Sequence, residues 1–133
     1  MTKINAATLP WPVPEGLLQI LQEIVEGNTG AVIINFRSPG YSPTQGGFHP
    51  VEIMVSKTGQ ILYITDFSYV SMPPYEELAK EIDFDFSENS FQHQGREYEL
   101  GEGRGLFKIW SRNFTTYFKM GVFEVSVTEV EEI

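Results

Sequence analysis

Apolar residues near the N-terminus recur every three or four positions, which is the spacing of one face of an α-helix. Glutamine and glutamate occupy the other side of this pattern, and Gly27 follows it as a stop signal. The spacing therefore predicts a helix over about 15–26. A second pattern of the same kind, rich in aromatic residues, predicts a helix over about 104–119, with Gly121 as its C-terminal cap.

Between the two helical patterns the periodicity changes to alternation of apolar and polar residues, which is typical of half-buried β-strands. Thr58 and Gly59 form a turn signal that joins two such runs into an antiparallel hairpin. A β-rich run predicts a strand at about 31–37, and alternation predicts strands at about 50–57, 60–68 and 81–87. A weaker hairpin within 91–100 and a last strand at 122–127 are also expected.

The remaining segments are interpreted by their proline and glycine content. Residues 38–47 form the longest predicted loop. Prolines interrupt the sheet within 70–75, and residues 75–80 are expected to form one helical turn. Three glycines within 101–105 predict a flexible joint rather than a phosphate-binding loop, because the Lys-Ser/Thr ending of such a loop is missing.

This order of elements predicts the α+β class, since consecutive strands with short turns form antiparallel sheets and amphipathic helices must cover an apolar face. We expect a twisted antiparallel sheet of about five to seven strands, covered by both helices. Residues 1–133 are expected to form a single domain, with 1–13 as an extended, proline-rich arm that Trp11 packs onto the body.

Composition excludes several classes of function. The chain has 133 residues, 18 acidic and 9 basic, for a net charge of −9, and 13 of the acidic residues lie within 76–133. This balance disfavours nucleic acid and anionic membrane surfaces as partners, and favours a basic protein partner. The absence of cysteine excludes disulfides and thiol chemistry. No signal peptide or membrane-spanning run is visible, so we expect a cytoplasmic protein.

Few residues are candidates for chemistry. His49, after a glycine-rich loop, titrates near neutrality, although a hydrogen bond to backbone at the strand entry is the simpler interpretation. Asp66 follows on the return strand and is expected to cap a turn or to bond the neighbouring loop. Asp83 and Asp85 share one face of a strand and are expected to face water. The second histidine, His93, is interpreted as a surface residue, and no metal site, cofactor motif or catalytic residue is predicted.

Four segments together resemble a known family. They are GGFHPVEI at 46–53, YITDF at 63–67, EIDFDF at 81–86 and the aromatic helix at 106–118. They resemble a family of small bacterial hypothetical proteins, known only as a domain of unknown function. That family is similar in fold to the mitochondrial acidic matrix protein that binds complement C1q. The resemblance implies a twisted antiparallel sheet flanked by N- and C-terminal helices, and a homo-oligomer with acidic faces, but no catalytic residues. The strand expected at 122–127 departs from this pattern.

Two functions follow as hypotheses. The first is a non-enzymatic, acidic binding or adaptor protein that recognises a protein partner. Aromatic residues are enriched at interface hot spots, so its candidate anchors are the aromatic residues beside loops: Tyr41, Phe48, Tyr69 and Tyr75. The alternative is a small-molecule-binding protein or enzyme with a site near His49 and Asp66.

Overall fold

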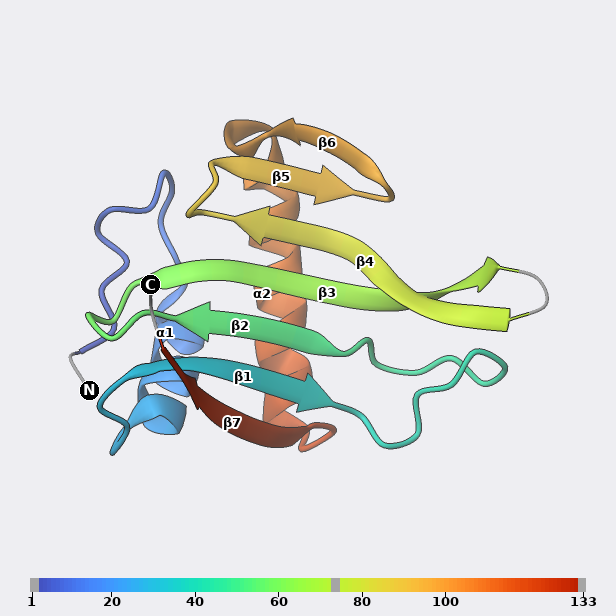
Figure 1. Ribbon diagram of the computed structural model, residues 1–133, viewed down its shortest axis with the longest axis horizontal. Helices are drawn as coiled ribbons and strands as arrows, with labels where there is room; N and C mark the ends of the chain where they lie inside the picture. Colours follow the sequence, from blue (N-terminus) through green and yellow to red (C-terminus); the bar gives the residue numbers. More distant parts are fainter. Residues whose placement is uncertain (1–2, 73–74, 132–133) are drawn as a thin grey trace.

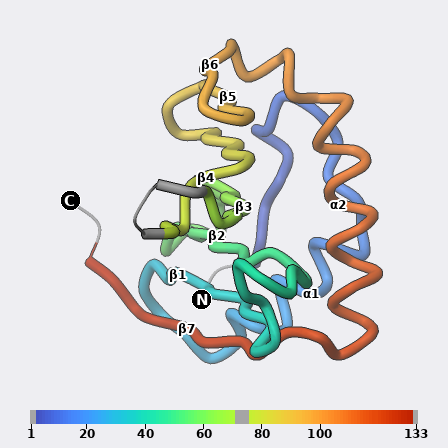
Figure 2. The backbone as a smooth tube through the Cα atoms, turned by 90° about the vertical axis from the view of Figure 1, so that its right-hand side faces the viewer, coloured from blue at the N-terminus to red at the C-terminus, as the bar shows by residue number. Residues whose placement is uncertain are grey.

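The computed structural model describes residues 3–72 and 75–131 and has two layers. One layer is a seven-stranded antiparallel sheet, and the other consists of two helices that lie on the same side of it. Figure 2 shows both helices on one side, with the opposite face of the sheet left open. The structure therefore confirms the predicted α+β class and antiparallel sheet.

The strand order is β6-β5-β4-β3-β2-β1-β7, so every strand pairs with its sequence neighbour except β7, which returns beside β1. Figure 1 shows this order from top to bottom, with α2 running behind the sheet across the strands. The elements are α1 (Glu15–Val25), β1 (Ala31–Arg37), β2 (Val51–Val55), β3 (Ile61–Met72), β4 (Tyr75–Asp85), β5 (Ser90–His93), β6 (Arg96–Glu99), the short 3₁₀ helix η1 (Leu100–Gly103), α2 (Arg104–Lys119) and β7 (Glu124–Val130).

The core lies between the sheet and the helices, and aromatic side chains fill much of it. Phe36 from β1, Phe84 from β4 and Phe107 from α2 are fully buried. Trp11 of the N-terminal arm is 4% exposed, and its ring lies 5.4 Å from that of Phe107. Burying such large side chains supplies much of the free energy that holds the two layers together.

The prediction of a helical turn at 75–80 is wrong. These residues form the first half of β4, paired with β3 from Phe67 opposite Lys80 to Met72 opposite Tyr75. Glutamate, leucine, alanine and lysine favour helix locally, but the long partner strand supplies ladder hydrogen bonds that outweigh this weak preference. The predicted proline break at 73–74 lies outside the described residues.

The predicted glycine joint is instead the ordered turn η1, which leads directly into α2. Glu99 and Glu102 form a reciprocal capping box at its start. Gly103 is buried, and a Cβ atom at this position would lie 2.9 Å from the ring of Phe91. The glycine is thus explained by a close approach between η1 and β5, which fixes where α2 begins.

Candidate functional site

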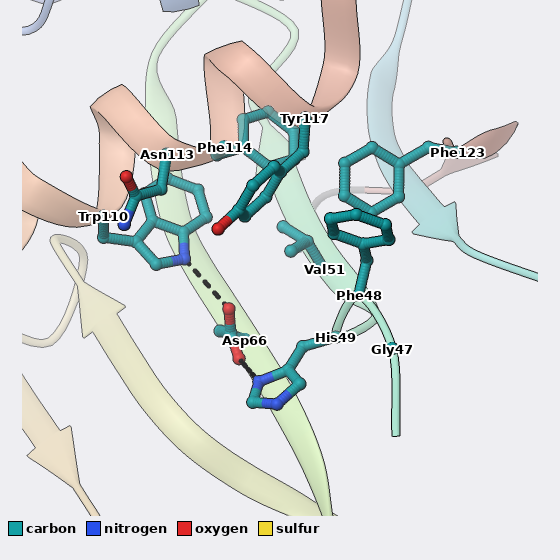
Figure 3. A pocket seen from close by; sticks show the side chains of 10 residues that line it. All are labelled: Gly47, Phe48, His49, Val51, Asp66, Trp110, Asn113, Phe114, Tyr117 and Phe123. Carbon is teal, nitrogen blue, oxygen red and sulfur yellow. Dashed lines mark hydrogen bonds and ion pairs between the residues drawn. The ribbon is translucent and has the colours of Figure 1, made fainter. Parts of the chain in front are cut away.

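The candidate site centres on three side chains that come from three separate parts of the chain. His49 lies in the loop before β2, Asp66 lies in β3 and Trp110 lies in α2. His49 Nδ1 is 2.8 Å from Asp66 Oδ1, and Trp110 donates its indole N–H to Asp66 Oδ2 over 3.0 Å. Figure 3 shows the carboxylate between the two rings. Both oxygens of Asp66 are therefore engaged, which holds the imidazole in one orientation.

The sheet explains why Asp66 points toward the helices. It pairs with Val51 of β2, a buried residue of the helix-covered face. On its other side it pairs with Ile82, and the register then shifts so that Phe67 pairs with Lys80, leaving Glu81 as one extra residue on β4. Such bulges commonly re-aim side chains beside functional sites.

Two backbone features hold His49 above this point. The N–H of Phe67 donates to the carbonyl of Pro50 over 2.9 Å, which ties the loop to β3. Gly47 has a φ of 125°, a conformation that favours glycine. The N–H of Tyr69 also donates to the Tyr41 hydroxyl over 3.1 Å, so backbone groups of β3 hold the loop in addition to the bond between His49 and Asp66.

Asp66 changes the acid–base behaviour of His49. Its hydrogen bond raises the pKa of His49 above the ordinary value of 6.5, burial opposes this, and the charges of Asp66 and Glu81 add to the increase. Because the carboxylate accepts a hydrogen bond from Nδ1–H, the other ring nitrogen, Nε2, is available to form a hydrogen bond with a ligand. Nε2 is an acceptor in the neutral ring and a donor in the protonated ring.

A pocket of about 320 Å³ lies between this chain of hydrogen bonds, the loop and α2. Figure 3 shows His49 and Asp66 together at one side of the pocket and Phe48 and Phe123 together at another, while Asn113 lies beside Trp110 on α2, away from His49. The rings of Phe48 and Tyr117 are 4.7 Å apart. The lining residues are Gly47, Phe48, His49, Val51, Asp66, Trp110, Asn113, Phe114, Tyr117 and Phe123. An apolar pocket with a few convergent polar groups is the usual form of a small-molecule site.

Three of the candidate residues from the sequence meet in this pocket, namely Phe48, His49 and Asp66. The simpler interpretation of His49 is wrong, because the imidazole bonds a carboxylate and not the backbone. The predicted bond from Asp66 to the neighbouring loop is confirmed. Tyr41 lies beside the pocket, with its ring 5.4 Å from that of His49.

Asp83 and Asp85 lie away from the pocket, on the open face of the sheet with Tyr63 and Thr65. The expectation that Asp83 faces water is wrong, since the residue is 7% exposed and accepts a hydrogen bond from Thr65 over 2.7 Å. Neighbouring side chains on this face cover it. Tyr69 is 36% exposed, and the side chain of Tyr75 lies outside the described residues.

Three residues that line the pocket from α2 were not predicted from the sequence to have a functional role: Trp110, Asn113 and Tyr117. Their spacing of three and four residues places them on one helical face. In the sequence, the one sign of this face is Asn113, a polar residue that stands between the aromatic residues Trp110 and Phe114. Only the tertiary structure shows that this face meets His49.

The described residues contain no group of three or more His, Cys, Asp or Glu side chains that could hold a metal ion. Neither helix in residues 3–72 and 75–131 has the length and apolar character needed to cross a bilayer. The side chains that line the pocket include an imidazole, a carboxylate, an amide and several aromatic rings.

Comparison with solved structures gives two similar proteins of Vibrio cholerae. A hypothetical protein from the VSP-II pathogenicity island is 35% identical, with a TM-score of 0.75 over 88% of this chain and 94% of that one. A conserved hypothetical protein from the pathogenicity island VPI-2 is 36% identical, with a TM-score of 0.71 over 88% of this chain and 95% of that one. The latter is described as sharing structural homology with the human P32 protein.

A search of curated proteins gives no significant match. The family profile described as "Protein of unknown function (DUF2787)" matches residues 15–128, which include both helices and all of the residues that line the pocket. The resemblance inferred from the sequence is thereby confirmed. The chain belongs to the DUF2787 family.

Proposed function

We propose that this protein binds a small organic acid, with an apolar or aromatic body, in the pocket between the 47–49 loop and α2. The observation that carries the proposal is the imidazole of His49, held by Asp66 at the polar end of an aromatic pocket. The volume of about 320 Å³ falls at the lower end of the range of ligand sites, which suits a compact ligand.

The charges at the polar end favour an acceptor group on the ligand. When His49 is protonated, its charge is balanced by Asp66, and Nε2–H can donate to a carboxylate. Phe48 and Tyr117 form an apolar wall for the body of the ligand. A ligand with a carboxylate and an aromatic ring matches both the imidazole and the aromatic wall of the pocket. The local donor from His49 favours this anion even though the net charge of the chain is −9.

The test compares the affinity of the protein for phenylacetate with its affinity for the neutral phenylacetamide. Calorimetry measures both affinities, and NMR of the His49 ring shows whether each compound binds beside it. We expect phenylacetate to bind more tightly, and more tightly at pH 6 than at pH 8, because protonated His49 donates from Nε2. His49→Ala is expected to weaken binding at least tenfold. His93→Ala is the matched control, since the only other histidine lies in β5 and lines no part of this pocket.

A result that would contradict the proposal is equal binding of the two compounds, or equal loss in the two histidine variants. A large fall in the melting temperature of His49→Ala would favour a structural role for the imidazole. Turnover of a carboxylate ester at the pocket, lost in His49→Ala, would favour an enzyme, with the Asp66-held imidazole as general base.

The second candidate function is the adaptor inferred from the sequence, which binds a basic protein. It is supported by the outer end of the β3–β4 hairpin, where three apolar side chains are exposed beside Glu76 and Glu77: Tyr69, Val70 and Leu78. Figure 1 shows this end of the hairpin extending beyond the strands on either side of it, β2 and β5. The adaptor function would be supported if the affinity for a basic protein falls from low to high salt and is lost in Leu78→Ser. An affinity that does not depend on salt would contradict it.

We also propose a cytoplasmic location and a homo-oligomeric state. The lack of cysteine is consistent with a reducing compartment.

The proposed homo-oligomer is supported by the edge strand β7, which exposes Val125 and Val127, two apolar side chains that a second copy could cover. Sedimentation at several concentrations tests the oligomer, and a monomer at all of them would contradict it.

A further inference from the structure

A second concave surface lies on the other flank of α2. Two adjoining hollows of about 530 and 370 Å³ share Pro14 and Lys108 and run between α2 and the N-terminal arm with the start of α1. We call this surface the arm groove. Figure 2 shows the arm and α1 beside α2 on the same side of the sheet. Its lining residues are Trp11, Pro12, Val13, Pro14, Gly16, Arg104, Gly105, Phe107, Lys108, Arg112, Thr115 and Thr116.

The floor of the arm groove is apolar and rigid. Phe107 is buried in the core, and Trp11 packs against both Phe107 and Phe86, with ring centroids 5.4 and 5.7 Å away. Prolines on both sides of Val13 restrict the arm, since each fixes its own φ. A preformed surface of this kind loses little conformational entropy on binding.

The α2 side of the groove is positively charged. Arg104, Lys108 and Arg112 follow each other at intervals of four residues, and all three are exposed. None of them forms an ion pair within the described part of the chain. No Asp or Glu lines either hollow. Helix α2 holds four of the nine basic residues and none of the 18 acidic ones, so this flank contrasts with a strongly acidic chain.

We propose that the arm groove binds an extended acidic segment of a partner protein, with carboxylates at alternate positions. Four residues of α-helix advance about 6 Å, and two residues of an extended chain advance about 6.6–6.8 Å. Carboxylates at every second residue of the segment therefore match the spacing of Arg104, Lys108 and Arg112. The intervening side chains point the other way, toward Pro12 and Val13, where apolar residues fit.

Charge complementarity selects this occupant over a basic or neutral one. The three cations repel a basic segment, and an uncharged apolar segment leaves them unpaired. An acidic helix presents carboxylates on one face every three or four residues, but it leaves no alternate apolar side chain for the arm. The site is separate from the pocket of His49, because the two share no lining residue.

The probe is a fluorescent peptide, acetyl-Glu-Val-Glu-Phe-Glu-Val-Glu-amide, and its control replaces every Glu by Gln. We expect anisotropy to show saturable binding of the first peptide and at least tenfold weaker binding of the second. Arg112→Glu and Lys108→Glu are each expected to weaken binding about fivefold, as for an exposed ion pair. Arg96→Glu is the matched control, because Arg96 is an exposed arginine of β6 that lines neither hollow.

Gly105→Leu tests the groove without changing charge. Gly105 lines the first hollow, and a Cβ atom there meets nothing within 4 Å, so a larger side chain fills the groove and leaves the fold intact. Gly101→Leu is the control, since Gly101 in η1 is equally unobstructed and lines neither hollow. We expect the first variant alone to abolish binding of the Glu peptide.

Three results would overturn the proposal. Equal losses in Arg112→Glu and Arg96→Glu would indicate attraction to overall charge. Retained binding in Gly105→Leu, with an unchanged melting temperature, would place the peptide elsewhere. Stronger binding to vesicles with anionic lipids than to the Glu peptide would identify a membrane surface instead. His49→Ala is expected to leave peptide binding unchanged, so the outcome is independent of the small-acid site.

Discussion

Two aspartates on neighbouring strands show how the two faces of one sheet differ. Asp66 on β3 and Asp83 on β4 have side chains that are 13% and 9% exposed, so both carboxylates are largely removed from water. Asp66 points to the helix-covered face and accepts from Trp110, while Asp83 points to the open face and accepts from Thr65. The same residue type is thus buried twice, in two different settings.

The difference lies in what surrounds each carboxylate. Asp83 bonds the hydroxyl of Thr65 and the ammonium group of Lys80 and contacts no histidine, so we assign it a structural role. Asp66 bonds His49, raises its pKa and borders a pocket with aromatic walls. Burial of a carboxylate beside a hollow does not by itself indicate function, since Asp83 also lines one of about 260 Å³; what distinguishes Asp66 is its histidine partner.

The largest expected effect is the loss of stability in Asp66→Ala. Two donors lose their acceptor, and the indole N–H belongs to Trp110, which is 7% exposed. We expect the free energy of unfolding to fall by about 3 kcal/mol, as measured by urea denaturation. Asp66→Asn is the control, because its amide oxygen can still accept from Trp110. Unchanged stability in Asp66→Ala would show that the two hydrogen bonds of Asp66 do not stabilise the fold.

Asp83→Ala is expected to cost less, about 2 kcal/mol, in the same experiment. The hydroxyl of Thr65, a residue 2% exposed, loses its acceptor, while Lys80 is exposed and returns to water. Binding of phenylacetate should not change, because Asp83 lies on the opposite face of the sheet. A loss of ligand binding comparable to that of Asp66→Ala would contradict the division between the two faces.

Thr65→Val is expected to lower the free energy of unfolding by about 1 kcal/mol. The substitution keeps the shape of the side chain but removes the donor, and Asp83 still has Lys80 as a partner. Combining it with Asp83→Ala gives a double-mutant cycle, in which the losses should not add. Additive losses would show that the 2.7 Å bond contributes nothing to stability.

The smallest effect concerns pH. The folded protein raises the pKa of His49 above 6.5, so the stability that the protonated ring contributes is fully present below about pH 6.5 and is lost as pH rises through the raised value. NMR titration of the ring should therefore give a pKa above 6.5. Asp66→Asn should lower the pKa, and Asp83→Asn should leave it unchanged, since Asp83 is not among its causes.

Much of the fold could be predicted from periodicity. The helical pattern at 15–26 and the β-rich run at 31–37 correspond closely to α1 and β1, because each buries apolar side chains against the core. The hairpin of β5 and β6 also forms where Gln94 and Gly95, both with positive φ, make its turn. The last strand, which departs from the pattern implied by the resemblance, is β7.

Residues 75–80 show where this reasoning stops. Their composition favours helix, and only the presence of β3 alongside makes them a strand. Asp83 was expected to face water because it alternates with buried apolar residues. Alternation correctly placed it on the other face of the strand but contained no information on how closely Thr65 and its neighbours cover that face.

The sequence is enough to predict the class of fold, the two helices, most strands and the acidic character of the chain, because these follow from local periodicity and composition. It also singled out His49 and Asp66 by residue type. That these two residues meet could not be predicted from the sequence, since their contact depends on the β2–β3 register and on a bulge in β4. The same holds for Trp110, which approaches Asp66 from 44 residues away once α2 crosses the sheet. Contacts between distant segments arise from packing, and no local pattern encodes them.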